Sequence, residues 1–154
     1  YYVLGDSGIL IDSKAGPIYL TDSRLDLFGE KVEEEISRID SKSEVNTLQE
    51  IRKHLNKEDG YWIGSLDGKG IPHGLSGNMP VYEYTKVLCF TDGYSRLFEL
   101  YKKMDIQHFQ FDVDFIMDSI AETRKIEDQD SDCSIYKRSK KSDDLSVILV
   151  EKST

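Results

Sequence analysis

The sequence predicts an α+β domain built on antiparallel β-sheet. Apolar runs of strand length open and close the chain, helical patterns come in blocks between them, and glycine-containing turns join the first strands. A parallel sheet would instead need single helices alternating with single strands. Because 154 residues suffice for one hydrophobic core, we treat residues 1–154 as a single domain.

The opening segment is predicted to be an antiparallel meander. Strands at 1–4, 9–11 and 17–20 are separated by turns at 5–8 and 13–16. Gly5 and Gly8 are hairpin glycines in this interpretation. No helical pattern follows them, so they do not form a phosphate-binding loop.

Helical periodicity begins after Asp22. Apolar residues step by three or four positions through Leu25, Phe28, Val32, Ile36 and Ile39. After a polar loop at 41–45, the capping-box sequence Thr47-Leu48-Gln49-Glu50 predicts a short second helix. A turn at 59–60 then leads to a predicted strand at 61–63. The segment 64–77 contains five glycines, which predicts a mobile loop.

The later half is organised around the segment 86–93, KVLCFTDG. It indicates a buried strand that ends in an acidic turn and leads into a helix, because apolar residues recur at Leu97, Leu100, Tyr101 and Met104. Segment 79–84 is predicted to pair with this strand as a hairpin. A second helix carries Val113, Ile116, Met117, Ile120 and Arg124 on one face. A charged loop at 127–142 and a closing strand at 143–150 follow.

Composition limits the classes of partner. The chain is 38% hydrophobic and 32% charged, and no apolar run approaches the length of a membrane span. The net charge of −9 argues against a nucleic acid or an anionic membrane as partner. Neither Cys89 nor Cys133 requires a disulfide, which favours a reducing, cytoplasmic setting. The chain starts directly on an apolar strand, which we interpret as the beginning of a fragment.

Three acidic turns share one arrangement. Asp6, Asp92 and Asp143 each lie at the end of an apolar strand. If these strands are neighbours, the carboxylates meet, and their repulsion calls for a hard divalent cation. The alternative for Asp92 is that it only caps the helix that follows it.

The order and spacing of these motifs resembles the PP2C family of metal-dependent serine/threonine phosphatases, in its compact bacterial form. Gly5-Asp6-Ser7 is similar to the family's GDS turn, and Phe90-Thr91-Asp92-Gly93 is similar to its [ST]DG motif. The segment 143–147 is similar to its closing strand, and Arg124 with Glu127-Asp128 also matches compact members. The resemblance covers the whole chain but only the later part of a PP2C domain.

The resemblance implies a fold, a reaction and a set of metal ligands. The implied fold is a sandwich of two antiparallel sheets flanked by helices, truncated at its N-terminus. Asp92 and Asp143 would bind the core Mn²⁺ or Mg²⁺ pair, and Asp6 would correspond to an additional, weaker metal site. The implied reaction is hydrolysis of phosphoserine or phosphothreonine monoesters in a phosphoprotein substrate by metal-bound water.

Two departures from the family pattern weaken the enzymatic interpretation. The early Asp-Gly motif and the Arg that would hold the substrate phosphate should lie before Tyr1 and are absent from this sequence. Four positions after Asp92, where members often carry an acidic residue, this chain has Arg96. Arg96 would repel a cation and is a possible partner for Asp92. We therefore expect weak metal binding and incomplete catalysis in this fragment. A non-catalytic PP2C-like binding or regulatory domain is the alternative, followed by an antiparallel interaction module without metal.

Overall fold

The computed structural model describes residues 1–39 and 47–152. They form two compact units, one of Tyr1–Asp6 with Thr21–Asn78 and one of Ser7–Leu20 with Met79–Thr154. The described residues contain four α-helices and two antiparallel sheets, which confirms the α+β prediction. The predicted loop at 41–45 lies outside the described residues. Among the described helices, none combines the length and the apolar character needed to cross a bilayer.

The sheet of the first unit has two short strands. β1 (Tyr2–Val3) pairs antiparallel with β4 (Leu75–Ser76), so the predicted hairpin between 1–4 and 9–11 is wrong. The glycine at the turn explains the difference. Gly5 has φ +75°, and its N–H donates to the Asp22 carboxylate, so this turn is fastened by a side chain and does not close a hairpin.

Two helices of the first unit pack on each other. α1 (Arg24–Ile39) and α2 (Thr47–Lys53) lie where helical periodicity predicted them. The ring of Phe28 lies 6.0 Å from the buried ring of Tyr61. The predicted strand at 61–63 is wrong: Tyr61 makes an isolated bridge to Leu55, and the N–H of Ile63 donates to the side chain of Asn56. A side-chain acceptor takes the place of a neighbouring strand. A 3₁₀ turn, η1 (Ile71–His73), follows later in this unit.

The second unit is built on a four-stranded sheet in the order β3-β2-β5-β6. Its strands are β2 (Gly8–Ser13), β3 (Gly16–Thr21), β5 (Tyr84–Phe90) and β6 (Val147–Glu151). β5 pairs antiparallel with both β2 and β6, placing Leu88 between Leu10 and Leu149.

Two strand predictions in this unit need correction. The predicted hairpin of 79–84 with 86–90 is wrong, because a 3₁₀ turn, η2 (Val81–Glu83), follows Pro80 and β5 begins at Tyr84. The closing strand begins at Val147, four residues later than predicted. Residues 143–146 are used instead for contacts with the turn after β5, which are described below.

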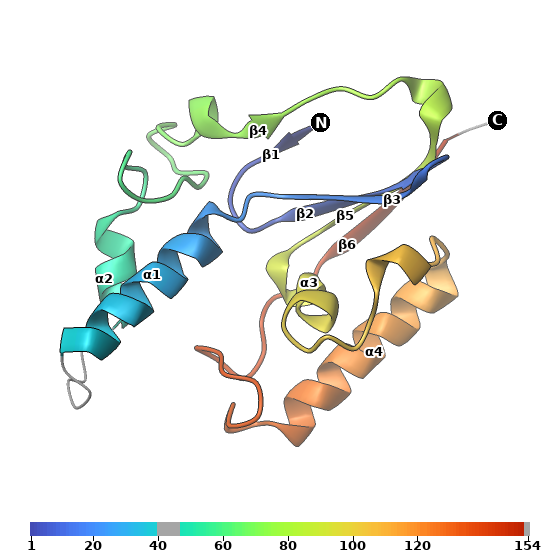
Figure 1. The fold of residues 1–154 in the computed structure, drawn as a ribbon. Coiled ribbons are helices and arrows are strands. Elements are labelled where there is room, and N and C mark those ends of the chain that lie inside the picture. The colour runs from blue at the N-terminus through green and yellow to red at the C-terminus, as the bar shows by residue number, and fades with distance from the viewer. Residues whose placement is uncertain (40–46, 153–154) are drawn as a thin grey trace. The chain divides into compact units, whose positions relative to one another are not determined.

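Two helices cover one face of this sheet. α3 (Asp92–Glu99) and α4 (Val113–Gln129) lie on the same side of it, with a short 3₁₀ turn, η3 (Ile106–His108), between them in the chain (Figure 1). The core between sheet and helices is largely aromatic and is formed by Leu10, Leu88, Phe90, Tyr94, Phe98, Phe109, Phe111 and Ile116. α4 extends past Glu127, where a loop was predicted, because Ile126 and Glu127 are buried on its inner side.

Candidate functional site

The turn after β5 places Asp92 at the start of α3. Thr91 is the N-cap residue and has extended backbone, and Asp92 is the first residue in helical conformation. The interpretation of Asp92 as the cap is therefore wrong in detail. A carboxylate in the first helical turn is still favoured there by the helix dipole.

The segment before β6 is hydrogen-bonded to this turn. The Thr91 N–H donates to the Ser146 carbonyl over 3.1 Å, and the Ser146 N–H donates to the Thr91 hydroxyl over 3.0 Å. The hydroxyl in turn donates to the Asp144 carbonyl over 2.9 Å. A Cβ on Gly93 would come within 2.4 Å of that carbonyl oxygen and 3.3 Å of the Asp143 Cβ. The structure thus brings the turns carrying Asp92 and Asp143 together, which was expected on the condition that their strands are neighbours, as β5 and β6 are.

The Asp143 carboxylate is paired with two cationic side chains. Its Oδ2 accepts from Arg96 Nη2 over 2.6 Å, and its Oδ1 pairs with Lys140 Nζ and accepts from the Asp144 N–H. Burial acts to raise the pKa of this carboxyl, but Lys140, the Asp144 N–H and Arg96 together hold the pKa below its usual range. Asp143 is therefore ionised at neutral pH.

The negative charge of Asp92 also affects the pKa of Lys140. The pKa of its ammonium is raised, mainly by the hydrogen bond to Asp143 and further by the negative charge of Asp92. Arg96, which the sequence offered as a possible partner of Asp92, forms ion pairs with Asp143 and with Glu127. We call the group Asp92, Arg96, Lys140 and Asp143 the Asp143 corner.

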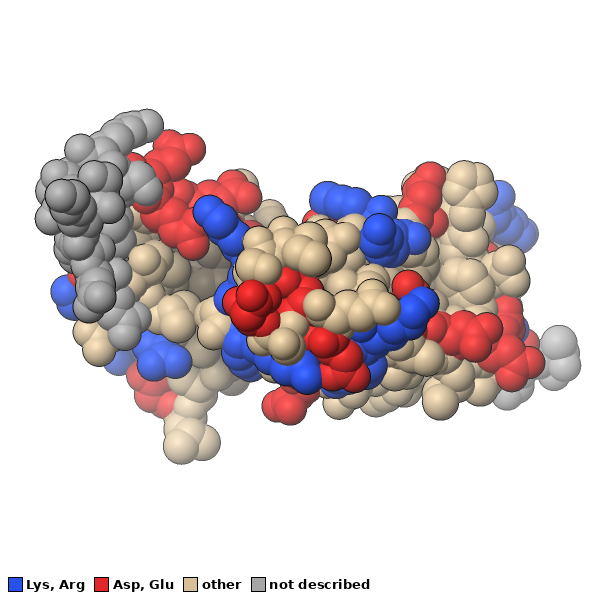
Figure 2. All heavy atoms as spheres, turned by 90° about the horizontal axis from the view of Figure 1, so that it is seen from below, with Lys and Arg blue, Asp and Glu red and all other residues tan. Residues whose placement is uncertain are grey.

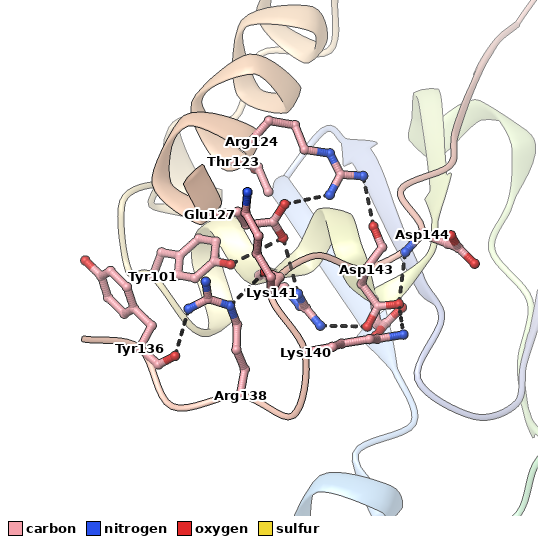
Figure 3. Close-up of polar contacts among 12 residues, drawn as sticks. Tyr101, Thr123, Arg124, Glu127, Tyr136, Arg138, Lys140, Lys141, Asp143 and Asp144 are labelled. Carbon is pink, nitrogen blue, oxygen red and sulfur yellow. Dashed lines mark hydrogen bonds and ion pairs between the residues drawn. The ribbon is translucent and has the colours of Figure 1, made fainter. Parts of the chain in front are cut away.

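A buried glutamate supports the corner from α4. The side chain of Glu127 is 1% exposed and accepts from Arg96 over 3.2 Å, from Arg124 over 2.6 Å and from the Tyr101 hydroxyl over 3.4 Å. Arg124 also donates to the Asp143 carbonyl over 2.9 Å (Figure 3). Arg96 and Arg124 therefore join Glu127 to both the side chain and the backbone of Asp143.

A second acid–base group holds the loop that carries Lys140. The Asp130 carboxylate pairs with Arg138 and accepts the N–H groups of Ile135 and Tyr136. Arg138 also donates to the carbonyls of Asp130, Tyr136 and Lys141, so the guanidinium contacts the loop along its length (Figure 3). We call this pair with its backbone partners the Asp130 clasp.

The clasp lies in the segment 127–142, for which the sequence predicted a charged loop. The side chains of Asp130 and Arg138 are 1% and 4% exposed. Burial acts to raise the pKa of the Asp130 carboxyl, but the Ile135 N–H, Arg138 and the Tyr136 N–H lower the pKa to about 2. No pattern in the sequence pairs these two residues, because the loop between them has no regular period.

Of the three predicted metal ligands, two lie in one unit and the third lies in the other. Asp6 is exposed and belongs to the first unit, whereas Asp92 and Asp143 belong to the second. Within residues 1–39 and 47–152, no three Asp, Glu, His or Cys side chains are grouped so that they could hold a metal ion together.

The Asp6 turn has a support of its own that sequence reasoning missed. Asp22 is 2% exposed; one carboxylate oxygen accepts from Arg24 Nε over 2.7 Å and the other from the Gly5 N–H over 3.4 Å. Burial acts to raise the pKa of Asp22, but hydrogen bonds from Arg24 lower it. The sequence signal that could have revealed this ion pair was the i, i+2 spacing of Asp22 and Arg24 at the start of a helix.

Figure 2 shows acidic and basic side chains next to one another on the face in view, without a broad basic area. Comparisons with protein-family models, curated proteins and solved structures gave no match to this chain.

Proposed function

We propose that this chain is the later part of a PP2C-like phosphatase domain. The protein containing it would hydrolyse phosphoserine and phosphothreonine monoesters of phosphoproteins, with Mn²⁺ or Mg²⁺. The observation that carries the proposal is the contact of the Thr91-Asp92-Gly93 turn with residues 143–146. The motif resemblance requires this contact, which continues the antiparallel pairing of β5 with β6 beyond Phe90 and Val147.

The carboxylate oxygens of the Asp143 corner are the type of donor that binds a hard cation. Carboxylate oxygens are the ligands that Mg²⁺ and Mn²⁺ prefer, and Asp92 and Asp143 would supply them. Two carboxylates are too few to complete a site, and both oxygens of Asp143 are already paired. Further ligands and the displacement of one cationic side chain are therefore needed.

When bound, the cation would supply an activated water and neutralise charge on the phosphoryl group. The residues of this chain would hold the ion and orient its ligands. Asp92 and Asp143 would bind the ion, and Glu127 would fix the orientation of Asp143 through Arg96 and Arg124.

A specific observation favours a second candidate, a non-catalytic PP2C-like binding or regulatory domain. Arg96 and Lys140 already neutralise Asp143, so the corner is electrostatically balanced without a metal. In this candidate the two cations replace the metal permanently, and the fold serves recognition.

Phosphatase assays on the full-length protein separate the two candidates. Turnover of p-nitrophenyl phosphate and of a phosphothreonine peptide is measured with and without Mn²⁺. The phosphatase proposal expects Mn²⁺-dependent turnover that Asp92→Asn and Asp143→Asn reduce at least about 100-fold, as for loss of charge stabilisation at a catalytic centre. Asp118→Asn, an exposed carboxylate on α4, serves as the matched control. Absence of Mn²⁺-dependent turnover in the wild-type protein would favour the non-catalytic domain.

A further inference from the structure

β6 is one edge of the four-stranded sheet, so only one of its sides is hydrogen-bonded to another strand of the described chain (Figure 1). Ser146 and Lys152, just beyond its two ends, form backbone hydrogen bonds on the side of β5. Because the backbone groups of successive strand residues point to opposite sides, those of Val147, Leu149 and Glu151 point away from β5. They are directed towards a further strand.

This edge lacks the features by which proteins usually protect an exposed edge strand. Residues 147–150 include no charged residue and no proline, and their register with β5 is continuous, without a bulge. Val147 and Leu149 pack against the aromatic core on the helix side of the sheet. Ile148 and Val150 lie on the opposite face and are 64% and 53% exposed. The edge therefore combines outward backbone groups with exposed apolar side chains.

One alignment matches this edge to a second copy of itself. If two β6 strands pair antiparallel about a two-fold axis at Leu149, they overlap over their full length. Each exposed Ile148 then lies opposite an exposed Val150 of the other copy, as a closely spaced cross-strand pair. Val147 and Glu151 also lie opposite each other, and their outward backbone groups exchange hydrogen bonds.

The charges at the two ends of β6 favour the same alignment. It brings Lys152, just after β6, towards Asp144 of the other copy, which lies just before β6. An axis at Glu151 would instead place Glu151 opposite itself, and an axis at Val147 would place it opposite Asp143. Like charges opposite each other are destabilising, so the full overlap is favoured over these shifted pairings.

We propose that β6 pairs with β6 of a second copy of this chain and joins two four-stranded sheets into one continuous antiparallel sheet. This interface goes beyond the proposed function and does not depend on it. Because the paired edge is short, the interface is small and the dimer is weak and concentration-dependent. Its formation removes the exposed edge and brings Ile148 and Val150 into contact across the two copies.

Sedimentation velocity of the full-length protein over a range of concentrations tests the proposal. We expect a dimer whose dissociation constant rises about tenfold or more with Ile148→Lys, because charged side chains then replace apolar cross-strand contacts. Val150→Glu should weaken the dimer to a similar extent. Ile135→Lys changes a 70% exposed residue outside the sheet, so it is the matched control and should leave the dissociation constant unchanged. Circular dichroism checks that each variant is folded.

A mixture of two variants tests the alignment itself. Ile148→Lys and Val150→Glu, mixed in equal amounts, should form a heterodimer about fivefold or more tighter than the dimer of either variant alone. The reason is that the alignment places the introduced lysine opposite the introduced glutamate. In the wild-type protein, the amide hydrogen of Leu149 should exchange more slowly as the protein concentration rises, since the dimer hydrogen-bonds it.

Four results would overturn the proposal. One is a monomer at every concentration with fast exchange of the Leu149 amide. Another is a monomer in which that amide is protected, since residues outside 1–154 would then cover the edge. A dimer that Ile148→Lys leaves intact would assign the association to another surface. Weakening by both Ile148→Lys and Val150→Glu without rescue in their mixture would overturn the alignment about Leu149.

Discussion

The Asp130 clasp and the Asp143 corner each contain a largely buried carboxylate–arginine pair in the same unit, but the corner has in addition an exposed lysine partner. In the clasp, Arg138 is 4% exposed and bonds to one carboxylate and three carbonyls of its own loop. In the corner, Arg96 is also mostly buried, but the second cation, Lys140, is 56% exposed. The Asp130 carboxylate is enclosed by protein groups, whereas the Asp143 carboxylate is covered by a lysine side chain that can move away.

This difference separates a structural ion pair from a site that can exchange ligands. A buried pair whose donors and acceptors are all satisfied is costly to break and has nothing to offer a ligand. A carboxylate that is oriented by buried groups but covered by one exposed side chain is held in place and remains accessible. The corner depends on the clasp, because the clasp fixes the loop that carries Lys140.

The largest effect should come from breaking the clasp. Arg138→Gln leaves the Asp130 carboxylate buried without its charged partner, so we expect a loss of about 3–5 kcal/mol in the free energy of unfolding. Thermal and urea unfolding followed by circular dichroism measure it. Lys140→Gln is the control from the corner and should cost less than about 1 kcal/mol. Similar losses for both variants would contradict the distinction between a closed and an open pair.

A smaller effect is expected from separating the two turns that form the corner. Gly93→Ala puts a Cβ within 2.4 Å of the Asp144 carbonyl oxygen, and the backbone must shift at a cost of about 1–3 kcal/mol. Gly64→Ala is the matched control, because no atom lies within 4 Å of a Cβ built there. Urea unfolding of the two variants measures the difference. An unchanged stability for Gly93→Ala would argue against the contact that supports the proposed function.

The smallest effect near neutral pH should come from titrating the clasp, because its carboxyl is already ionised there. The pKa of Asp130 is about 2 in the folded protein and 3.8 as the reference value for the unfolded chain. A carboxyl with a lowered pKa stabilises the folded state above the unfolded pKa, and this contribution is lost as the pH falls from about 4 towards 2. Wild type should lose more stability over that interval than Asp130→Asn in urea unfolding, and parallel losses would contradict the assignment.

The sequence placed Asp92 and Asp143 at the ends of apolar strands, and the meeting of their turns was expected only if those strands were neighbours, as β5 and β6 are. The ion pairs of Asp143 were not predictable. Arg96 was a possible partner of Asp92, since it lies one helical turn further along α3, but its guanidinium forms ion pairs with Asp143 and Glu127. Lys140 lies in a loop without periodicity, so its partner depends on how the clasp folds that loop.

The sequence by itself determined where the helices α1, α3 and α4 begin and where the strand 86–90 and its acidic turn lie. These features depend on local periodicity, on turn residues and on the conformational preference of glycine, which act over a few neighbouring positions. Only the tertiary structure decided that β1 pairs with β4, that Val81–Glu83 form a 3₁₀ turn, and that Arg96 and Lys140 share Asp143. Such contacts join distant segments, and packing chooses among many chemically equivalent charged partners.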